Sequence, residues 1–127
     1  LDYDGMRATE RGSVHSDSVV LPAALAVAER EHASGREFLA ALVLGNDVVT
    51  RLGAASQLPH KGWYHTAIYG IYGAAAAAAR LLKLDAEKTQ HAFGIALSQT
   101  AATQLPNISH SLTKRFSSSF AAHARNA

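Results

Sequence analysis

The chain has 127 residues, a length that suits a single domain, and its hydrophobic share of 48% is enough to build a buried core. Alanine supplies much of this share, while aromatic residues make up only 7%. Because alanine favours helices and disfavours strands, composition predicts an all-α fold. The net charge is only +2 and Lys and Arg form no dense cluster, which argues against nucleic acid as a partner. The absence of cysteine excludes disulfides, thiolate nucleophiles and Cys-ligated metal clusters from this chain.

We identify no apolar run long and uninterrupted enough to span a bilayer, and no signal-like segment at the start. These features predict a soluble, cytoplasmic protein without a membrane partner. The chain opens on Leu1 rather than Met and breaks off inside an expected helix. We therefore expect a segment of a longer protein.

Residues 1–17 are polar and contain glycine, which predicts a loop. Apolar residues then recur at helical spacing, and a first helix is predicted to begin near Val20, because Pro22 is tolerated only in a first turn. Ser34 and Glu37 have the spacing of a capping box and predict the start of a second helix that runs to about residue 56. Gly45 lies within it and weakens it unless a neighbouring helix needs a close approach.

A third helix is predicted from Thr66 to Leu82, with six consecutive alanines at 74–79. Asp85 is the expected N-cap of a fourth helix over 86–104. The inner side of this fourth helix is predicted to carry Ala92, Phe93, Ile95, Ala96 and Gln99. Residues 105–119 read as irregular, and a last helix is predicted to open at Phe120. The expected architecture is an all-α bundle of about five helices.

Two of the seven histidines, His15 and His65, come immediately before a predicted helix. The free N–H groups and the macrodipole at a helix start favour anions, so a histidine there can serve as a general acid or base beside a bound carboxylate. The alternative is an ordinary structural histidine, which is our interpretation of His32, His91 and His123, while His60 and His110 are interpreted as surface histidines in polar loops. Lys114 and Arg115 form a small basic pair, which is either a solvated pair or a clamp for an acidic substrate.

Other common sites find no support in the sequence. No HExxH spacing, P-loop or GxGxxG occurs, and the serines of "FSSSF" lack the setting of a nucleophile elbow. The spacing of the histidines and carboxylates therefore predicts no metal site.

The sequence resembles the MmgE/PrpD family along nearly its whole length. The segments that carry the resemblance occur in the family's order, and the stretch from His65 to Asp85 is the most specific part. They are "LDYD" (1–4), "HSDSVVLPAALAVAE" (15–29), "SGREFLAALVLGNDVVTRLG" (34–53), "GWYHTAIYGIYGAAAAAARLLKLDAEKTQHAFGIALSQTAA" (62–102) and "TKRFSSSFAAHA" (113–124).

The resemblance implies a central segment of the family's helical domain, with the N-terminal helices and the later α+β domain absent from residues 1–127. It also implies a homodimer that works without metal or cofactor on small di- or tricarboxylates. The family includes 2-methylcitrate dehydratase, cis-aconitate decarboxylase and iminodisuccinate epimerase. From the resemblance we expect dehydration of a 2-methylcitrate-like substrate.

Four family positions can be matched to residues of this chain. His15 and His65 would be the acid and base, and Asp2 would orient a catalytic histidine or contact the substrate. Lys114 would bind a substrate carboxylate and stabilise negative charge in the transition state, with Arg115 beside it.

The chain departs from the family pattern at four places in these motifs. Gly5 stands where the family has a second Asp, Ser16 replaces the Pro after the first His, and Ser119 replaces a common Gly. Thr66 stands where Pro often follows the second His. Three interpretations therefore remain: an enzyme segment, a non-catalytic fragment or pseudoenzyme of the same family, and a helical interaction module.

Overall fold

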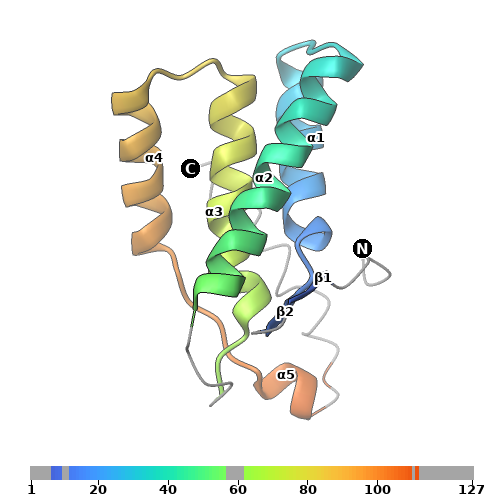
Figure 1. Cartoon of the computed structure of the whole chain (residues 1–127), viewed down its shortest axis with the longest axis vertical. Helices are drawn as coiled ribbons and strands as arrows, with labels where there is room; N and C mark the ends of the chain where they lie inside the picture. The colour runs from blue at the N-terminus through green and yellow to red at the C-terminus, as the bar shows by residue number, and fades with distance from the viewer. Residues whose placement is uncertain (1–6, 10–11, 57–61, 110, 112–127) are drawn as a thin grey trace.

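Figure 1 shows the computed structural model of the chain, which describes residues 7–9, 12–56, 62–109 and 111. Four helices dominate this part of the chain and confirm the all-α prediction: α1 (Asp17–Arg30), α2 (Gly35–Ala55), α3 (His65–Leu81) and α4 (Ala86–Ser98). A single-turn helix, α5 (Leu105–Ile108), follows α4. A short hairpin of β1 (Arg7–Thr9) and β2 (Gly12–Val14) precedes α1.

The hairpin corrects the prediction of a loop over residues 1–17. β1 and β2 pair antiparallel, with Arg7 opposite Val14 and Thr9 opposite Gly12. Strands of three residues are too short to show a period-2 pattern in the sequence. Val14 is buried against α2, where its side chain lies beside Gly53.

The first helix also begins three residues earlier than predicted, at Asp17 rather than Val20. The carbonyl of Ser16 accepts from the N–H groups of Val19 and Val20, so helical bonding is established before Pro22 is reached. The segment from residue 105, predicted to be irregular, opens with α5, which has Pro106 in its first turn, where proline is favoured. The helix predicted at Phe120 lies outside the described residues.

Helix α3 forms the centre of the fold. It contacts α1, α2 and α4, and Figure 1 shows it between α4 on one side and α1 and α2 on the other. All six alanines at 74–79 are buried, with exposed fractions of 8% or less. Because an alanine side chain ends at Cβ, a helix of this kind can be approached closely from several sides with little loss of side-chain entropy.

Glycines set the closest approach between helices. A Cβ on Gly73 would lie 2.6 Å from the carbonyl oxygen of Gly45, and a Cβ on Gly45 would lie 2.7 Å from the carbonyl oxygen of Gly73. The backbones of α2 and α3 therefore touch at this crossing, with Val20 of α1 packed beside it. This confirms the prediction that Gly45 serves a close neighbour.

The turns α1–α2 and α3–α4 are built in the same way. Each leading helix ends in a Schellman motif, in which Ala33 N–H donates to Ala28 O at 2.9 Å and Leu84 N–H donates to Ala79 O at 3.0 Å. Each following helix is N-capped by a side chain, with the predicted capping box at Ser34 confirmed. Asp85 is the N-cap of α4. The turns contain one left-handed residue each, His32 (φ 50°) and Lys83 (φ 53°).

The inner side predicted for α4 is only partly right. Ala96 is buried and Phe93 is half-buried, and both pack near Ile71 and Ala75 of α3. Ile95 is 62% exposed and Gln99 is exposed as well. α4 carries apolar residues on more than one face, so periodicity alone did not select the side that meets α3.

We expected no segment that could span a bilayer, but α2 is long and apolar enough to do so by length and composition alone. It has 21 residues, and its most apolar stretch has a mean hydropathy of 1.4. In the structure its apolar character is partly used in packing, because Ala41 and Val49 are buried against the rest of the bundle. On its outer side Arg51 donates to Asp47 at 2.7 Å.

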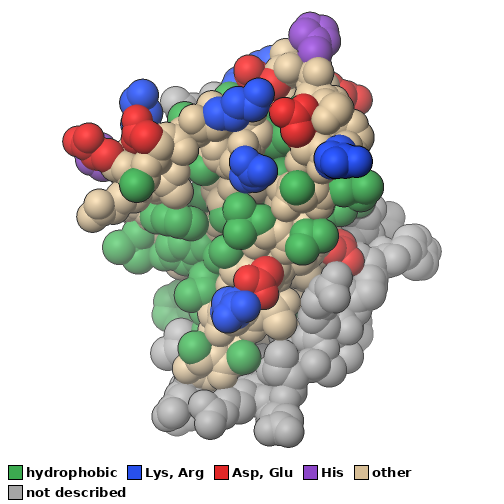
Figure 2. Space-filling model, turned by 45° about the horizontal axis from the view of Figure 1, so that its top comes forward, with side chains coloured by type: hydrophobic (Ala, Val, Ile, Leu, Met, Phe, Trp, Pro, Cys, Tyr) green, Lys and Arg blue, Asp and Glu red, His purple; other side chains and the backbone are tan. Residues whose placement is uncertain are grey.

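Several large apolar side chains are nevertheless exposed. Figure 2 shows hydrophobic side chains gathered on one face below a rim of charged ones. The exposed set over the described residues is Leu25, Leu39, Val43, Leu44, Leu52, Trp63, Ile95, Leu97, Leu105 and Ile108.

Candidate active site

The two histidine-bearing junctions lie next to each other in the fold. His15 lies between β2 and α1, and His65 is the first residue of α3. The main-chain N–H of His15 donates to Thr66 Oγ1 at 3.1 Å, a contact that links residues 51 positions apart. Thr66 is buried, so the start of α3 and the entrance to α1 are joined in the interior.

Close packing of α1 on α3 brings these junctions together. A Cβ on Gly70 would lie 2.8–3.0 Å from the side chain of Val19. Val19 is completely buried in the first turn of α1, and Gly70 lies in the second turn of α3. Without a side chain at 70, the two helix starts can approach to hydrogen-bonding distance.

The meeting of two helix N-termini makes this region suited to an anion. α1 and α3 each begin without a side-chain hydrogen bond from their N-cap residues, Ser16 and Tyr64. Because both helices begin at the junction joined by His15 and Thr66, their first-turn N–H groups and the positive ends of their macrodipoles lie at the same end of the bundle. A carboxylate is the kind of ligand that such a place stabilises.

Each histidine has a defined setting. His65 is 7% exposed, and its ring lies 5.6 Å from the ring of Tyr69, centroid to centroid, at an interplanar angle of 48°. Tyr69 is one helical turn further along α3, and its hydroxyl donates to Ser56 Oγ at the C-terminal end of α2. His15 is half-buried, and its carbonyl accepts from Ser18 Oγ at 2.8 Å.

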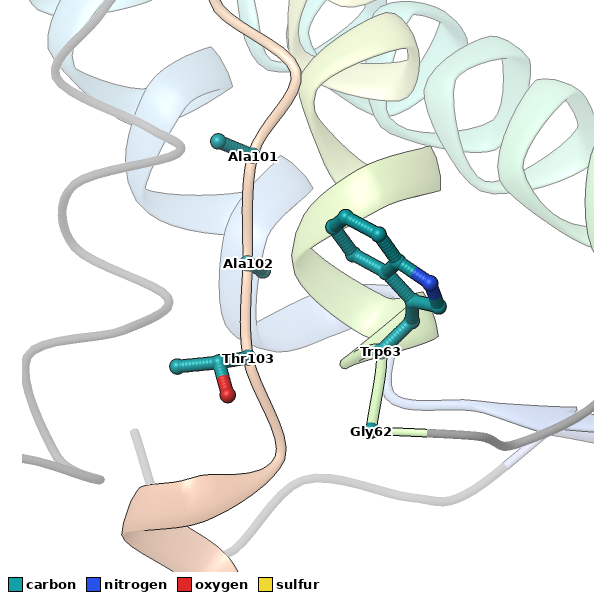
Figure 3. Close-up of a pocket in the computed structure, with 5 residues that line it drawn as sticks. All are labelled: Gly62, Trp63, Ala101, Ala102 and Thr103. Atoms are coloured by element: carbon teal, nitrogen blue, oxygen red, sulfur yellow. The ribbon is translucent and has the colours of Figure 1, made fainter.

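The residues before His65 are held by the segment that follows α4. Gln104 N–H donates to Gly62 O at 2.8 Å, and Trp63 pairs with Thr103 in an isolated antiparallel bridge. A shallow pocket of about 450 Å³ opens here, and Figure 3 shows the Trp63 ring beside the strand-like segment 101–103. Neither His15 nor His65 lines this pocket, and its walls are mainly apolar, so it does not suit a polycarboxylate.

The structure describes only part of the predicted site. It places His15 and His65 at adjoining junctions, while Asp2, Lys114 and Arg115 lie outside the described residues. That the histidines, the aspartate and the basic pair line one pocket therefore stays a prediction. Within the described part of the chain, no three His, Cys, Asp or Glu side chains converge as a metal site would require.

Sequence reasoning missed the residues that connect this region. Thr66 was noted only as a departure from the family pattern, yet it binds the backbone of His15. Tyr69 follows His65 by four residues, and this spacing on one helix face was a usable signal. No sequence signal indicated that Ser56, from a different helix, meets Tyr69.

Comparison with known proteins agrees with the resemblance. The profile of the MmgE/PrpD N-terminal domain matches residues 1–127. A cis-aconitate decarboxylase-like protein, oryM, of Aspergillus oryzae is 36% identical over 119 residues, which cover 86% of this chain and 24% of that protein. A cis-aconitate decarboxylase of Aspergillus terreus is 35% identical over 94 residues, which cover 68% of this chain and 19% of that protein.

The chain thus matches a quarter or less of the length of these curated relatives. No solved structure gives a significant match. The profile match over the whole chain and the identities above 30% establish the family, and the chain belongs to the MmgE/PrpD family.

Proposed function

We propose that the complete protein containing this chain is a lyase that acts on a small di- or tricarboxylate by acid–base catalysis. The observation that carries the proposal is the junction of two helix N-termini, each with a histidine, joined by the hydrogen bond from His15 N–H to Thr66 Oγ1. A plain interaction module has no need of this arrangement. Membership of a family with cis-aconitate decarboxylase relatives supports the same reading.

The chemistry needs two things that this region offers. A substrate with several carboxylates needs positive potential, which helix N-termini provide, and we assign Lys114 and Arg115 as additional cations. Its reacting carbon needs a proton donor or acceptor, and we assign this role to His65 and His15, with Asp2 orienting one of them. No metal or organic cofactor enters the proposal.

The names of the relatives favour decarboxylation over the dehydration that we expected from the sequence. In decarboxylation of an unsaturated tricarboxylate, the bond to one carboxylate breaks and CO₂ leaves. The electron pair passes into the adjacent allylic system, and a histidine delivers one proton to carbon. Charge and atoms balance without an oxidant, and the cations stabilise the carbanion-like transition state.

We further propose a cytoplasmic homodimer.

The reaction is tested by incubating the complete protein separately with cis-aconitate and with 2-methylcitrate and following the products by NMR. Release of CO₂ from cis-aconitate supports decarboxylation, whereas loss of water from 2-methylcitrate supports dehydration in its place. A folded complete protein that converts neither substrate would argue for the pseudoenzyme interpretation.

The roles of the histidines are tested by substitution in the same complete protein. His65→Ala and His15→Ala should each lower kcat by about 10²- to 10⁴-fold, the usual contribution of a general acid or base. His91→Ala is the matched control, because His91 is exposed on α4. Near-normal turnover by His65→Ala would remove His65 from the mechanism.

The basic pair gives a second test of the site. Lys114→Ala should lower kcat/KM by about 10²-fold or more, since one preorganised charge-stabilising donor is typically worth that much. Arg115→Ala should act mainly on KM if Arg115 only holds a remote carboxylate. Equal and small effects of both substitutions would favour the solvated-pair interpretation.

A further inference from the structure

Behind His65 lies a chain of contacts that reaches a different helix. The imidazole of His65 packs on the ring of Tyr69, with 5.6 Å between ring centroids, and both residues are 7% exposed. The Tyr69 hydroxyl donates to Ser56 Oγ. Ser56 is the C-cap of α2, and its N–H donates to Leu52 O at 2.9 Å. The end of α2 is therefore tied through one tyrosine to the first residue of α3.

A histidine at the first position of a helix needs such support. The side chain at this position has no preceding helical turn to pack on, so its rotamer is set by neighbours. Tyr69 lies one turn onward on the same face and covers one side of the imidazole. The hydroxyl bond to Ser56 limits rotation of Tyr69, because the ring must keep its position to preserve that bond.

We propose that Tyr69 is a positioning residue that fixes the imidazole of His65, and that Ser56 fixes Tyr69. In its catalytic consequence this proposal rests on the proposed function, in which His65 transfers a proton. It extends that function by making the geometry of the acid–base group depend on the contact between α2 and α3. Proton transfer requires the donor and acceptor atoms to be held within a narrow range of distance and angle.

The first measurement reads the imidazole directly and needs no turnover. The complete protein is labelled with ¹³C and ¹⁵N at histidine, and the ring signals of His65 are assigned by their loss in His65→Gln. Tyr69→Leu, which removes the aromatic ring, should shift and broaden these signals. Tyr69→Phe and Ser56→Ala, which remove only the hydroxyl bond, should both broaden them, and the double variant should resemble either single variant.

Tyr72→Phe is the matched control for the tyrosine substitution. Tyr72 lies on the same helix, but its hydroxyl accepts from Thr100 Oγ1 at 3.2 Å and its ring faces Phe93 rather than His65. This variant should leave the His65 signals unchanged. Unchanged His65 signals in Tyr69→Phe, Ser56→Ala and Tyr69→Leu would overturn the proposal, whether or not the protein is active.

The second measurement uses steady-state kinetics with the substrate found above. Tyr69→Phe and Ser56→Ala should each lower kcat by about 10-fold with KM unchanged, since a misplaced catalytic group loses rate rather than binding. The double variant should again match the singles. A drop in kcat no larger than that of Tyr72→Phe, or a change in KM alone, would contradict positioning. If wild type converts no polycarboxylate, the proposed function fails, and the NMR comparison alone decides the contact.

Discussion

At the residue scale, three glycines determine how closely the helices approach one another. Gly45 and Gly73 let the backbones of α2 and α3 touch, and Gly70 admits Val19 of α1 beside the start of α3. These contacts bring the two histidine junctions within reach of one hydrogen bond. The geometry of the candidate site therefore depends on glycines that take no part in its chemistry.

Gly73→Ala should destabilise the fold. The new Cβ would overlap Val49 of α2 and lie 2.6 Å from the carbonyl oxygen of Gly45, which belongs to a backbone that cannot rotate away. Overpacking of this kind costs about 1–3 kcal/mol or more. The free energy of unfolding from urea titration measures the loss.

Gly94→Ala on α4 is the matched control for that substitution. A Cβ there meets nothing within 4 Å, so only helix propensity changes, and stability should rise by up to about 1 kcal/mol. A stabilising Gly73→Ala would show that α2 and α3 are not in backbone contact.

The sequence allowed part of this to be predicted. A glycine inside the second helix indicated a close neighbour, because glycine weakens a helix unless close packing against another helix offsets the loss. It did not identify that neighbour as Gly73, nor did it show that Thr66 and Tyr69 contact the histidine junctions. Contacts between distant segments depend on how helices cross, and local patterns do not encode that crossing.

At the element scale, the bundle is assembled from two helical hairpins with the same turn design. Each turn places a non-glycine residue in the left-handed region, His32 in one and Lys83 in the other, where glycine is the usual choice. Ser34 and Asp85 then cap the following helices. Lys83 Nζ lies 3.5 Å from Glu37 Oε1, so the two turns lie together at one end of the molecule.

His32→Gly should stabilise the protein. A non-glycine residue in the left-handed region costs about 1–2 kcal/mol, and relieving it gains about 1 kcal/mol after the greater flexibility of the unfolded chain is subtracted. His32 is exposed, so little packing is lost. Thermal unfolding measures the gain, with Arg36→Gly, in the first turn of α2, as a control that should destabilise. A destabilising His32→Gly would show that the histidine ring contributes to the turn.

Glu37 should make stability depend on pH. The pKa of its carboxyl is lowered, first by the backbone N–H of Ser34, then by the Ser34 hydroxyl, and then by Lys83. Since the folded-state pKa lies below the ordinary value of 4.5, this contribution is fully present above pH 4.5 and is lost as the pH falls through the folded-state pKa.

The measurement is the difference in unfolding free energy between wild type and Glu37→Gln, determined by urea titration from pH 3 to pH 7. The difference should shrink on the acid side. Added salt should leave most of it in place, because hydrogen bonds to Ser34 outrank the exposed Lys83 pair. A difference that vanishes in salt at pH 7 would assign the effect to Lys83 instead.

Elements with a strong local signal were predictable, and those without one were not. Ser34–Glu37 and Asp85 marked helix starts through their cap chemistry, and both are observed. The helix ends at His32 and Lys83 lack the usual glycine, and the hairpin strands are three residues each. The hairpin is held by contact with α2, which is tertiary information.

At the scale of the whole molecule, α3 is the common partner of the other three long helices, and the alanine run is what allows it. Composition predicted the helical class, and the family resemblance assigned His65, beside the start of this helix, as an acid or base. Composition did not reveal which helix is central, since alanine is frequent in α1, α2 and α4 as well. Burial of all six alanines at 74–79 answers that question.

The attachment of α4 is the weakest of the three and leads to the last prediction. α1 and α2 pack on α3 and on each other, whereas α4 packs on α3 through a small cluster of Ile71, Ala75 and Ala96 with Tyr72 and Phe93. Ile95 and Leu97 are more than 60% exposed and contribute little to holding it. A helix with so little buried apolar surface opens locally before the whole fold does.

Amide hydrogen exchange of the chain should therefore show lower protection in α4 than in α3. Phe93→Ala removes the largest side chain of that cluster and should speed exchange in α4 while leaving the centre of α3 unchanged. Gly94→Ala should slow exchange in α4, because it stabilises the helix without adding a contact. If α4 and α3 instead exchange at one common rate in all three proteins, α4 opens only with the whole bundle.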